Sequence, residues 1–319
     1  MSKIRAATKA DFDDLLGLDE FSVLDWAFLE RSASVRGAAN VSVHVETEDG
    51  RYVVPLIRRR VLGVYPVAES VPFALYGGVL PSSKSMDPPA YVATMQEVSR
   101  FAKMGIIFQN PFQQEVLASA HLEPVIQAHA HMVHTEGQVY ADLLAKVFEH
   151  KMRKNVKRAL ANDVVIRVGR SPQLVRDFYG MYEGSNARWG RKQPRYGLDF
   201  FLSYAEEPFF EVRVAYSGER PAASLVMLRF RNYYFGWFGA MNKELSNTRA
   251  NDLLHADLIR SATETGIKWI NFGSSANLAG VKKFKESFGA TERQYGVYFV
   301  GNRVARAALK TILNANRRK

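Results

Sequence analysis

Two stretches of the chain alternate apolar and polar residues around a short polar turn. The first, VSVHVETEDGRYVVPLIRRR, turns at the DG pair that ends with Gly50, and the second, FEVRVAYSGERPAASLVMLRFR, turns at the SG pair that ends with Gly218. Alternation with a period of two places apolar side chains on one face of a strand, and a glycine turn between two such runs is typical of a β-hairpin. The sequence therefore predicts two hairpins, one in each half of the chain.

Each hairpin is followed by the same succession of patterns. An aromatic, glycine-bearing stretch (FALYGGV or YYFGWFGAM) precedes a helical pattern over residues 89–103 or 251–265, with apolar residues three and four apart. A glycine, Gly105 or Gly266, follows each helix as its expected left-handed cap, and a buried strand comes next. We therefore predict one βββαβ module present twice. A single large α/β domain with coincidental similarity is the alternative.

The composition is that of a soluble globular protein with enough chain for two cores. Of the 319 residues, 47% are hydrophobic and 24% are charged, so disorder and low complexity are not expected. Cysteine is absent, which excludes disulfides, thiolate metal sites and cysteine nucleophiles. The start, MSKIRAATKADFDD, does not resemble a secretory signal, and no apolar run approaches the roughly 18 residues of a membrane span. A cytoplasmic protein is expected.

Positive charge is concentrated in the second half of the chain. The formal charge of +11 divides into −5 over residues 1–145 and +16 over residues 146–319. Part of the excess lies in HKMRKNVKRALANDVVIRV, where a helix would place Lys151, Lys154 and Arg158 on one side. Such a half is suited to a polyanion, such as the phosphates of a nucleotide, a nucleic acid or an anionic membrane surface. A solubilising surface charge is the simpler interpretation.

The chain ends in a second basic pattern, NRVARAALKTILNANRRK, whose apolar residues form one stripe on a helix. We favour packing of this stripe on a domain over contact with a membrane surface or a nucleic acid. The chain is therefore divided into an N-terminal domain over residues 1–145, a C-terminal domain over residues 146–300, and a basic helix over residues 301–319. This last helix is expected to pack back on the N-terminal domain.

Several kinds of active site lack their motifs. The chain has no Walker-type phosphate loop, no GxGxxG after a strand and no GxSxG nucleophile elbow. The one cluster of metal-ligand type is HAHMVH, with His129, His131 and His134. Only the first two would share a strand face, and no carboxylate follows at a suitable spacing, so we interpret all three as edge or interface histidines. Neither a metal nor a bound cofactor is expected.

Hairpin, third strand, helix and buried strand outline the GNAT acyltransferase fold, and IRAATKADFDDLLGL resembles the start of such a domain. TETGIKWINFGSSANLAGVKKFKESFGA resembles the signature of the FemAB group, which RKNVKRALANDVVI and FYGMYEGSNARWG also fit. The matching residues are Gly266, Phe272-Gly273, Phe284-Lys285 and Phe288-Gly289. The resemblance covers most of residues 150–300, and the first 145 residues only through Tyr76-Gly77-Gly78. It implies an α/β fold of two tandem GNAT-like domains, each a mixed, mainly antiparallel sheet flanked by helices.

Members of the FemAB group transfer amino acids from aminoacyl-tRNA onto peptidoglycan precursors, so the resemblance implies attack of an amine on an activated acyl carbonyl. The lysine after phenylalanine in the FemAB pattern lies where the ester end of the donor enters, which makes Lys285 our candidate catalytic residue. Its ammonium would stabilise the oxyanion or the departing ribose oxygen. Phe284 would pack beside the terminal adenine or ribose, and Lys282 and Lys283 would contact donor phosphates. A solvated lysine face is the alternative for KKFK.

Further candidates for binding substrate carry either a positive charge or a side chain that could line a groove. Those proposed for phosphates are Arg188, Arg153 and Lys154 on the acceptor side and Arg249 on the donor side, and those proposed for the groove are Tyr234, Trp237 and Asn271. No residue stands out as a general base. A carboxylate such as Glu183, water or the substrate itself could take the proton.

The donor can be inferred from a missing glycine. A GNAT enzyme that uses CoA holds the pyrophosphate on a glycine-rich turn at a helix N-terminus. The corresponding residues 246–253, SNTRANDL, contain no glycine and carry Asp252, and residues 82–89, SSKSMDPP, are no better suited. A donor held by side-chain charges, such as aminoacyl-tRNA, is therefore favoured over CoA.

We therefore predict an N-acyltransferase that moves an aminoacyl group from aminoacyl-tRNA to an amine of a peptidoglycan or other cell-envelope precursor, with the acidic first domain as a platform. A peripheral contact with the inner face of an anionic membrane is left open. The first alternative is an N-acyltransferase that uses acyl-CoA or an acyl carrier protein to modify a small amine, amino acid or sugar. The second is a non-catalytic polyanion-binding protein. A long apolar groove would favour a fatty acyl donor, and a wide polar cleft would favour tRNA.

Overall fold

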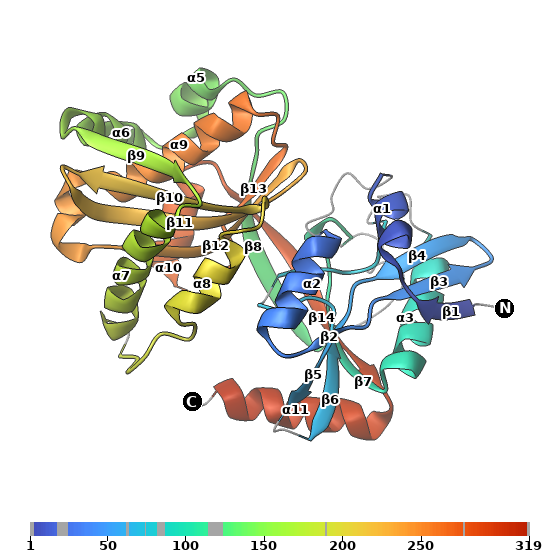
Figure 1. Cartoon of the computed structure of the whole chain (residues 1–319). Helices are drawn as coiled ribbons and strands as arrows, with labels where there is room; N and C mark the ends of the chain where they lie inside the picture. The colour runs from blue at the N-terminus through green and yellow to red at the C-terminus, as the bar shows by residue number, and fades with distance from the viewer. Residues whose placement is uncertain are drawn as a thin grey trace. The chain divides into compact units, whose positions relative to one another are not determined.

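The computed structural model describes residues 3–17, 25–61, 64–73, 75–81, 87–113, 124–188, 190–276 and 278–317. The chain forms two compact units, which can be followed along the chain in Figure 1. Unit 1 comprises Met1–His129 and Gln294–Lys319, and unit 2 comprises Ala130–Arg293. The strands β8 (Ile126–His134) and β14 (Thr291–Gly301) each have one end in each unit, so the chain passes between the units twice.

Unit 1 contains a small sheet and a larger one. The small antiparallel sheet has the order β1-β3-β4, with β1 (Lys3–Ala6), β3 (Val43–Thr47) and β4 (Gly50–Val54). The larger sheet has the order β2-β5-β6-β7-β14, with β2 (Ala39–Asn40), β5 (Ile57–Val61), β6 (Tyr65–Glu69) and β7 (Met104–Phe108). The helices of this unit are α1 (Lys9–Gly17), α2 (Trp26–Val35), α3 (Pro88–Ala102), the short 3-10 helix η1 (Pro111–Gln113) and α11 (Arg303–Arg317).

The first predicted hairpin is present as β3 and β4, with its turn before Gly50. Its second strand is shorter than the pattern indicated, because Pro55 has no backbone N–H with which to continue the ladder. The chain resumes as β5 at Ile57, in the other sheet. The stretch FALYGGV was expected to be a third strand, but residues 75–78 have no regular structure, and β6 occupies that place in the sequence of elements.

The helix predicted over residues 89–103 is α3, with Met95 and Val98 buried as expected. The prediction that Gly105 caps this helix in the left-handed conformation is wrong, because the residue with a positive φ at the end of the helix is Lys103, at 56°. Gly105 instead lies inside β7, where a Cβ atom would be 2.8 Å from the carbonyl oxygen of Ala68. Close backbone approach, rather than a turn, therefore requires glycine at this position.

Unit 2 contains one sheet covered by helices on both faces. The strand order is β8-β13-β12-β11-β10-β9, with β13 (Trp269–Asn271), β12 (Tyr233–Met241), β11 (Arg220–Phe230), β10 (Phe210–Ser217) and β9 (Val164–Gly169). All neighbours are antiparallel except β12 and β13. The helices are α5 (Tyr140–Asp142), the π-helix η2 (Leu143–Val147), α6 (His150–Ala161), α7 (Pro172–Arg188), α8 (Leu198–Tyr204), the 3-10 helix η3 (Lys243–Thr248), α9 (Ala250–Glu264) and α10 (Ala279–Glu286).

The two helix layers of unit 2 bury different kinds of side chain. Helices α6 and α9 lie on one face of the sheet and α7 and α8 on the other (Figure 1). Beneath α9, the fully buried Leu254, Leu258 and Ile259 pack in the aliphatic core, as the apolar spacing of residues 251–265 predicted. Beneath α7 and α8 the core is aromatic, with Phe178 and Phe201 at 4.9 Å between ring centroids. The hairpin of β10 and β11 and the left-handed Gly266 after α9 are also as predicted.

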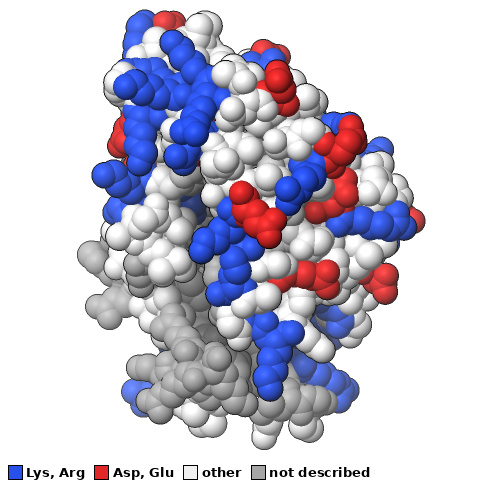
Figure 2. Space-filling view, turned by 90° about the vertical axis from the view of Figure 1, so that its left-hand side faces the viewer, with Lys and Arg blue, Asp and Glu red and all other residues white. Residues whose placement is uncertain are grey.

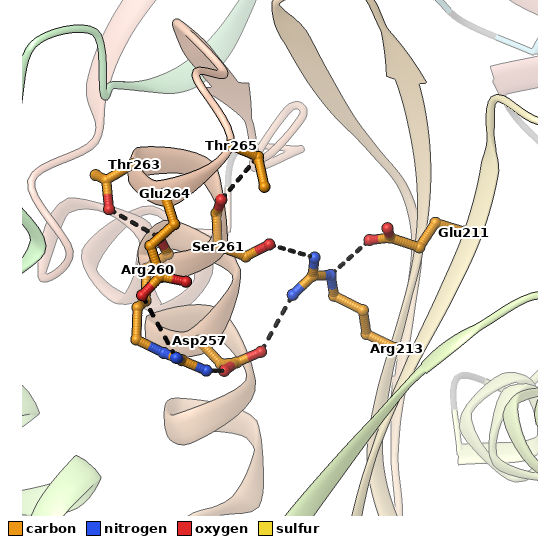
Figure 3. A network of polar contacts seen from close by, with 8 residues as sticks. All are labelled: Glu211, Arg213, Asp257, Arg260, Ser261, Thr263, Glu264 and Thr265. Carbon is orange, nitrogen blue, oxygen red and sulfur yellow. Dashed lines mark hydrogen bonds and ion pairs between the residues drawn. The ribbon is translucent and has the colours of Figure 1, made fainter.

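A buried arginine fastens α9 to the sheet (Figure 3). The side chain of Arg213, on β10, is 3% exposed and donates to Glu211 at 2.6 Å, to Asp257 at 3.1 Å and to Ser261 at 3.0 Å. Asp257 also pairs with Arg260 one turn along α9. Because the guanidinium has three polar partners inside the protein, its charge is compensated without solvent, and α9 is held in one register over β10.

Within the described residues, no helix combines the length and the apolar character needed to cross a bilayer. Helix α11 contacts β7 within unit 1, and Leu309 is 2% exposed. The two compact units are defined by contacts within the structure. The domain boundaries at residues 145 and 300 were instead predicted from charge and sequence pattern, so the predicted division into domains stays a prediction. Of residues 82–89, the N-terminal stretch considered for phosphate binding, residues 82–86 lie outside the described residues.

Candidate functional site

The candidate site lies at the end of β13, where this strand stops pairing with β12. These parallel strands pair over only three residues, after which β13 ends at the buried Asn271. The Asn271 side chain donates to the Tyr233 hydroxyl at 2.7 Å and accepts from the Gly273 amide at 2.6 Å. Gly273 adopts a φ of +71°, which an L side chain would strain. The resulting turn directs the carbonyl groups of Gly273 and Ser274 toward α10.

Helix α10 places Lys285 under this turn. The residue is 7% exposed, and its Nζ donates to the carbonyl oxygens of Gly273 at 2.9 Å and Ser274 at 2.8 Å. Burial lowers the pKa of Lys285 to about 8, because the ammonium loses hydration that two carbonyl groups replace only in part. An ammonium has three N–H donors, so one remains beyond these two bonds.

A buried histidine lies close to Lys285. His255, on α9, packs against Phe272, Phe284 and Phe288, with ring centroids 4.9–5.6 Å apart. The pKa of His255 is lowered to about 4, chiefly by burial and in smaller part by the charge of Lys285. Its Nδ1 is 2.8 Å from the carbonyl oxygen of Asn251. Since a carbonyl only accepts, Nδ1 carries the hydrogen and the lone pair is on Nε2.

A cavity of about 270 Å³ lies between the start of α6, the start of α9 and one side of α10. Its lining combines three cations, two carboxylates, one aromatic ring and small or apolar groups. These residues are Glu149, Lys151, Met152, Asn155, Arg249, Asp252, Gly280, Lys283, Phe284 and Ser287. We call this space the α6–α9–α10 cavity.

The lining of the cavity carries a net positive charge despite Asp252. Burial raises the pKa of Asp252, against the opposing effects of Arg249, Asn155 and Lys151. The three cations of the lining outnumber its two carboxylates, which suits a phosphate or another anionic group.

The backbone at the start of α9 is poorly arranged for holding a phosphate. Arg249 caps the helix in the left-handed conformation, with a φ of 63°. The Arg249 amide donates to the Ser246 carbonyl oxygen and the Ala250 amide to the Thr248 hydroxyl, both at 3.4 Å. A phosphate would have to displace these internal acceptors to bind the same N–H groups. An anion in the cavity would therefore depend on the side chains.

Phe284, Lys283 and Arg249, three of the residues predicted for the donor, line the α6–α9–α10 cavity together. Lys285 and Asn271 meet at the neighbouring turn, where Asn271 fixes the Gly273 amide and Lys285 binds the Gly273 carbonyl. The sequence had expected Asn271 to line the groove, but it is 0% exposed and acts on the backbone.

The other predicted residues lie elsewhere in unit 2. Lys282 points to carboxylates, at 2.8 Å from Glu292 and 3.8 Å from Glu286. Arg188, at the end of α7, donates to Ser185 and to the Met241 carbonyl oxygen and lines a different cavity of about 400 Å³. Arg153 and Lys154 line a groove on the far side of α6.

Two aromatic candidates belong to the packing of unit 2. Tyr234 is 1% exposed, and Arg213 and Arg229 lie over its ring at 5.7 and 5.9 Å from the centroid. Trp237 lies with the aromatic cluster of α8, at 5.0 Å from Tyr204 between ring centroids. Glu183, considered as a base, is exposed on α7, which covers the face of the sheet opposite α9.

Two of the histidines of HAHMVH, His131 and His134, have separate surroundings. His131 is fully buried, with Nδ1 3.2 Å from the Ser275 hydroxyl and Nε2 3.7 Å from Glu292. His134 packs on Trp269, at 4.5 Å between ring centroids. Over the part of the chain that the structure describes, no three His, Cys, Asp or Glu residues are grouped so that they could hold a metal ion.

Sequence reasoning missed two residues of this region. His255 occupies the apolar stripe of α9 between Leu254 and Leu258, a place where a polar residue signals either a buried partner or a site. Lys151 was assigned to a charged helix face rather than to the cavity, although its position at the start of α6 is what brings it near Arg249.

Comparison with known proteins agrees with this architecture. Residues 146–286 match the sequence model of a family described as "Acetyltransferase (GNAT) domain". None of the curated proteins compared with the sequence matches it significantly.

Three solved structures are similar along nearly the whole chain. The crystal structure of FemX has a TM-score of 0.70 at 12% identity, covering 96% of this chain and 99% of its own. The C-terminal domain of a putative lysylphosphatidylglycerol synthetase from Agrobacterium fabrum has a TM-score of 0.60 at 14% identity, covering 95% and 94%. A tandem GNAT protein from the clavulanic acid biosynthesis pathway has a TM-score of 0.52 at 9% identity, covering 94% and 98%. The chain therefore shares the fold of FemX and of the tandem GNAT protein, and its residues 146–286 match the GNAT domain family.

Proposed function

We propose that this protein is an N-acyltransferase that moves an aminoacyl group from aminoacyl-tRNA to an amine of a cell-envelope precursor. The observation that carries the proposal is the α6–α9–α10 cavity, where cationic side chains rather than helix amides are available for an anion, next to the buried Lys285. A donor held in this way needs phosphates but no glycine turn. The likeness in fold to FemX supports the same class of reaction.

In the proposed complex the phosphorylated 3′ end of the donor occupies the cavity. Lys151, Arg249 and Lys283 contact its phosphates, and Phe284, which is half-buried, offers its ring to the terminal base or ribose. The ester then points toward Lys285, one residue further along α10. A single-stranded end with a stacked base suits such a combination of cations and one aromatic ring.

The proposed reaction forms one C–N bond and breaks one C–O bond. The acceptor amine, in its neutral form, attacks the ester carbonyl carbon, and negative charge develops on the carbonyl oxygen. The Lys285 ammonium stabilises that charge and protonates the ribose oxygen as it leaves, while the attacking nitrogen loses a proton that restores the ammonium. With a pKa of about 8, Lys285 is still mainly protonated at neutral pH yet gives up its proton readily. Transfer should therefore slow as the pH rises above about 8.

The proposal is tested with purified protein, charged tRNA and a precursor that bears a primary amine. We expect transfer of the labelled aminoacyl group with intact tRNA and none after RNase treatment. Lys285→Met should lower kcat by about 100-fold or more, the usual effect of removing an oxyanion donor. Lys282→Met, on the same helix but paired with Glu292, is the matched control and should keep most of the activity. Transfer that persists without RNA when acyl-CoA is supplied would overturn the proposed donor.

A second candidate is an N-acyltransferase that uses acyl-CoA or an acyl carrier protein. The description of the matching family as an acetyltransferase favours it, as does an apolar groove of about 860 Å³ elsewhere in unit 2. The same assay separates the two donors, because acyl-CoA activity would be insensitive to RNase. A non-catalytic polyanion-binding protein would show neither activity and would bind tRNA equally well after Lys285→Met.

A further inference from the structure

Unit 2 also has an apolar groove on the far side of α6 from the proposed donor site. It has a volume of about 860 Å³, within the range of ligand sites. Its floor is made by the buried Val156, Val164 and Leu253, and Leu144 and Leu160 contribute to its sides. We call this space the α6–β9 groove, after two of the elements that border it.

Two lysines stand at the groove without acidic partners, whereas Arg260, which also lines it, pairs with Asp257 and Glu264. Lys154 and Lys157 line it and are exposed, and neither lies within ion-pair distance of a carboxylate among the described residues. Arg153 is turned to the carbonyl oxygens of Ala145 and Phe148, both at 2.8 Å, which fixes η2 beside α6. Figure 2 shows lysine and arginine side chains gathered on the upper part of the face that carries α6 and β9.

Two large apolar side chains are exposed on the groove side of unit 2. Leu160, which lines the groove, is 59% exposed. Val168 of β9 is 46% exposed and shares a strand face with Val164 and Ile166, which line the groove, because side chains two residues apart point to the same side of a strand. Exposed apolar side chains beside an apolar groove mark an interaction surface.

We propose that the α6–β9 groove and its cationic border dock on an anionic phospholipid membrane. Lysines attract anionic head groups, exposed valine and leucine side chains enter the interface between head groups and acyl chains, and the groove receives part of an acyl chain. A nucleic acid would use the lysines but would leave Leu160 and Val168 without a favourable partner. The combination of both kinds of residue therefore favours the membrane.

This inference extends the proposed function, because an enzyme that modifies envelope precursors would gain from being held at the bilayer. The two binding regions use different sides of α6. Lys151 and Asn155 face the α6–α9–α10 cavity, whereas Lys154 and Lys157 face the groove. The membrane and the donor can thus be bound at the same time, and vesicle binding can be measured in the absence of any acyl transfer.

The experiment is co-sedimentation of the full chain with phosphatidylcholine vesicles that either contain or lack phosphatidylglycerol. We expect binding to the anionic vesicles and little to the neutral ones. Lys157→Glu should weaken binding at least about fivefold, since one lysine near an anionic surface contributes about 1 kcal/mol. Leu160→Ser should weaken it about tenfold, through loss of an inserted apolar side chain.

Two variants elsewhere in unit 2 serve as matched controls. Lys192→Glu makes the same charge change between α7 and α8, on the other layer of helices, and Leu278→Ser removes a leucine that is 60% exposed, close to the 59% of Leu160. Both should bind vesicles as the wild type does. Equal losses in controls and groove variants, or equal binding to both kinds of vesicle, would overturn the proposal. A third result would also overturn it. If uncharged tRNA displaced the protein from vesicles, and did so equally well for Leu160→Ser and the wild type, the face would be a nucleic-acid surface.

Discussion

The burial of Lys285 makes the stability of the protein depend on pH in a defined direction. The pKa of Lys285 is lowered to about 8 in the folded state, from an ordinary value of 10.5. Between these two values the unfolded chain binds a proton that the folded chain does not hold, so the free energy of unfolding rises with pH. This contribution is complete above about pH 10.5 and is lost as the pH falls through about 8.

The magnitude follows from the two pKa values. Each pH unit within the window is worth about 1.4 kcal/mol, so the full contribution is about 3 kcal/mol. Going from about pH 7.5 to about pH 10 captures most of it, and we expect the wild type to gain about 2 kcal/mol from this residue over that interval. The bonds to Gly273 and Ser274 favour the ammonium, so the gain should not exceed this figure.

The assay is urea unfolding of the wild type and of Lys285→Met at both pH values. Other groups titrate equally in both proteins, so the difference between their pH responses isolates Lys285. Lys283→Met, which removes an exposed lysine of the same helix, should respond to pH as the wild type does. If Lys285→Met also shows the wild-type response, the lysine is not buried as described, and its assignment as a proton donor with a pKa of about 8 fails with it.

Three further substitutions test other parts of the structure by urea unfolding. Arg213→Met should lower the free energy of unfolding by about 3 kcal/mol, because it leaves Asp257 with less compensation inside the protein; an effect below about 1 kcal/mol would contradict the buried network. Gly301→Ala should cost at least about 2 kcal/mol, since its φ is +119° and a Cβ atom would lie 2.2 Å from the Lys103 carbonyl oxygen. Arg249→Gly should raise the free energy of unfolding by about 1 kcal/mol by removing a left-handed arginine, while binding of tRNA weakens; a loss of stability would contradict the strain.

The spacing of apolar residues along the sequence predicted those helices and strands that bury only one face. The apolar stripes of α3 and α9 and the alternation of β10 and β11 result from burial of a single face, which the sequence records directly. The same spacing did not predict where strands and helices end, because the backbone conformation decides this. The split of β4 from β5 at Pro55 depends on which sheet each strand joins. Lys103 rather than Gly105 has the positive φ after α3, because the helix already ends at Ala102.

The candidate site was predictable in its residues more than in their roles. A solvated face was the alternative for KKFK, and Lys282 and Lys283 are exposed. A helical wheel places Lys285 beside Phe288, three residues on, and could have indicated that this lysine points inward; Phe288 is fully buried, although α10 itself ends at Glu286. A helical wheel does not identify the groups that bind the buried Lys285 ammonium. The two carbonyl groups that receive Lys285 come from a turn whose shape is set by Asn271 and Gly273.

The structure explains why the start of α9 can lack a glycine: an arginine, Arg249, occupies the position where a glycine would be expected. The position is left-handed, as a glycine there would be, yet it is occupied by an arginine, which costs about 1 kcal/mol or more. Strain of this kind persists when the side chain gains something by its placement, and here the Arg249 guanidinium belongs to the lining of a cavity that also holds Lys151 and Lys283. The same turn can therefore expose amides with a glycine or present a cation with an arginine. The choice between these two residues at position 249 is the physical basis for expecting a donor that is recognised through its phosphates by side chains rather than by the helix.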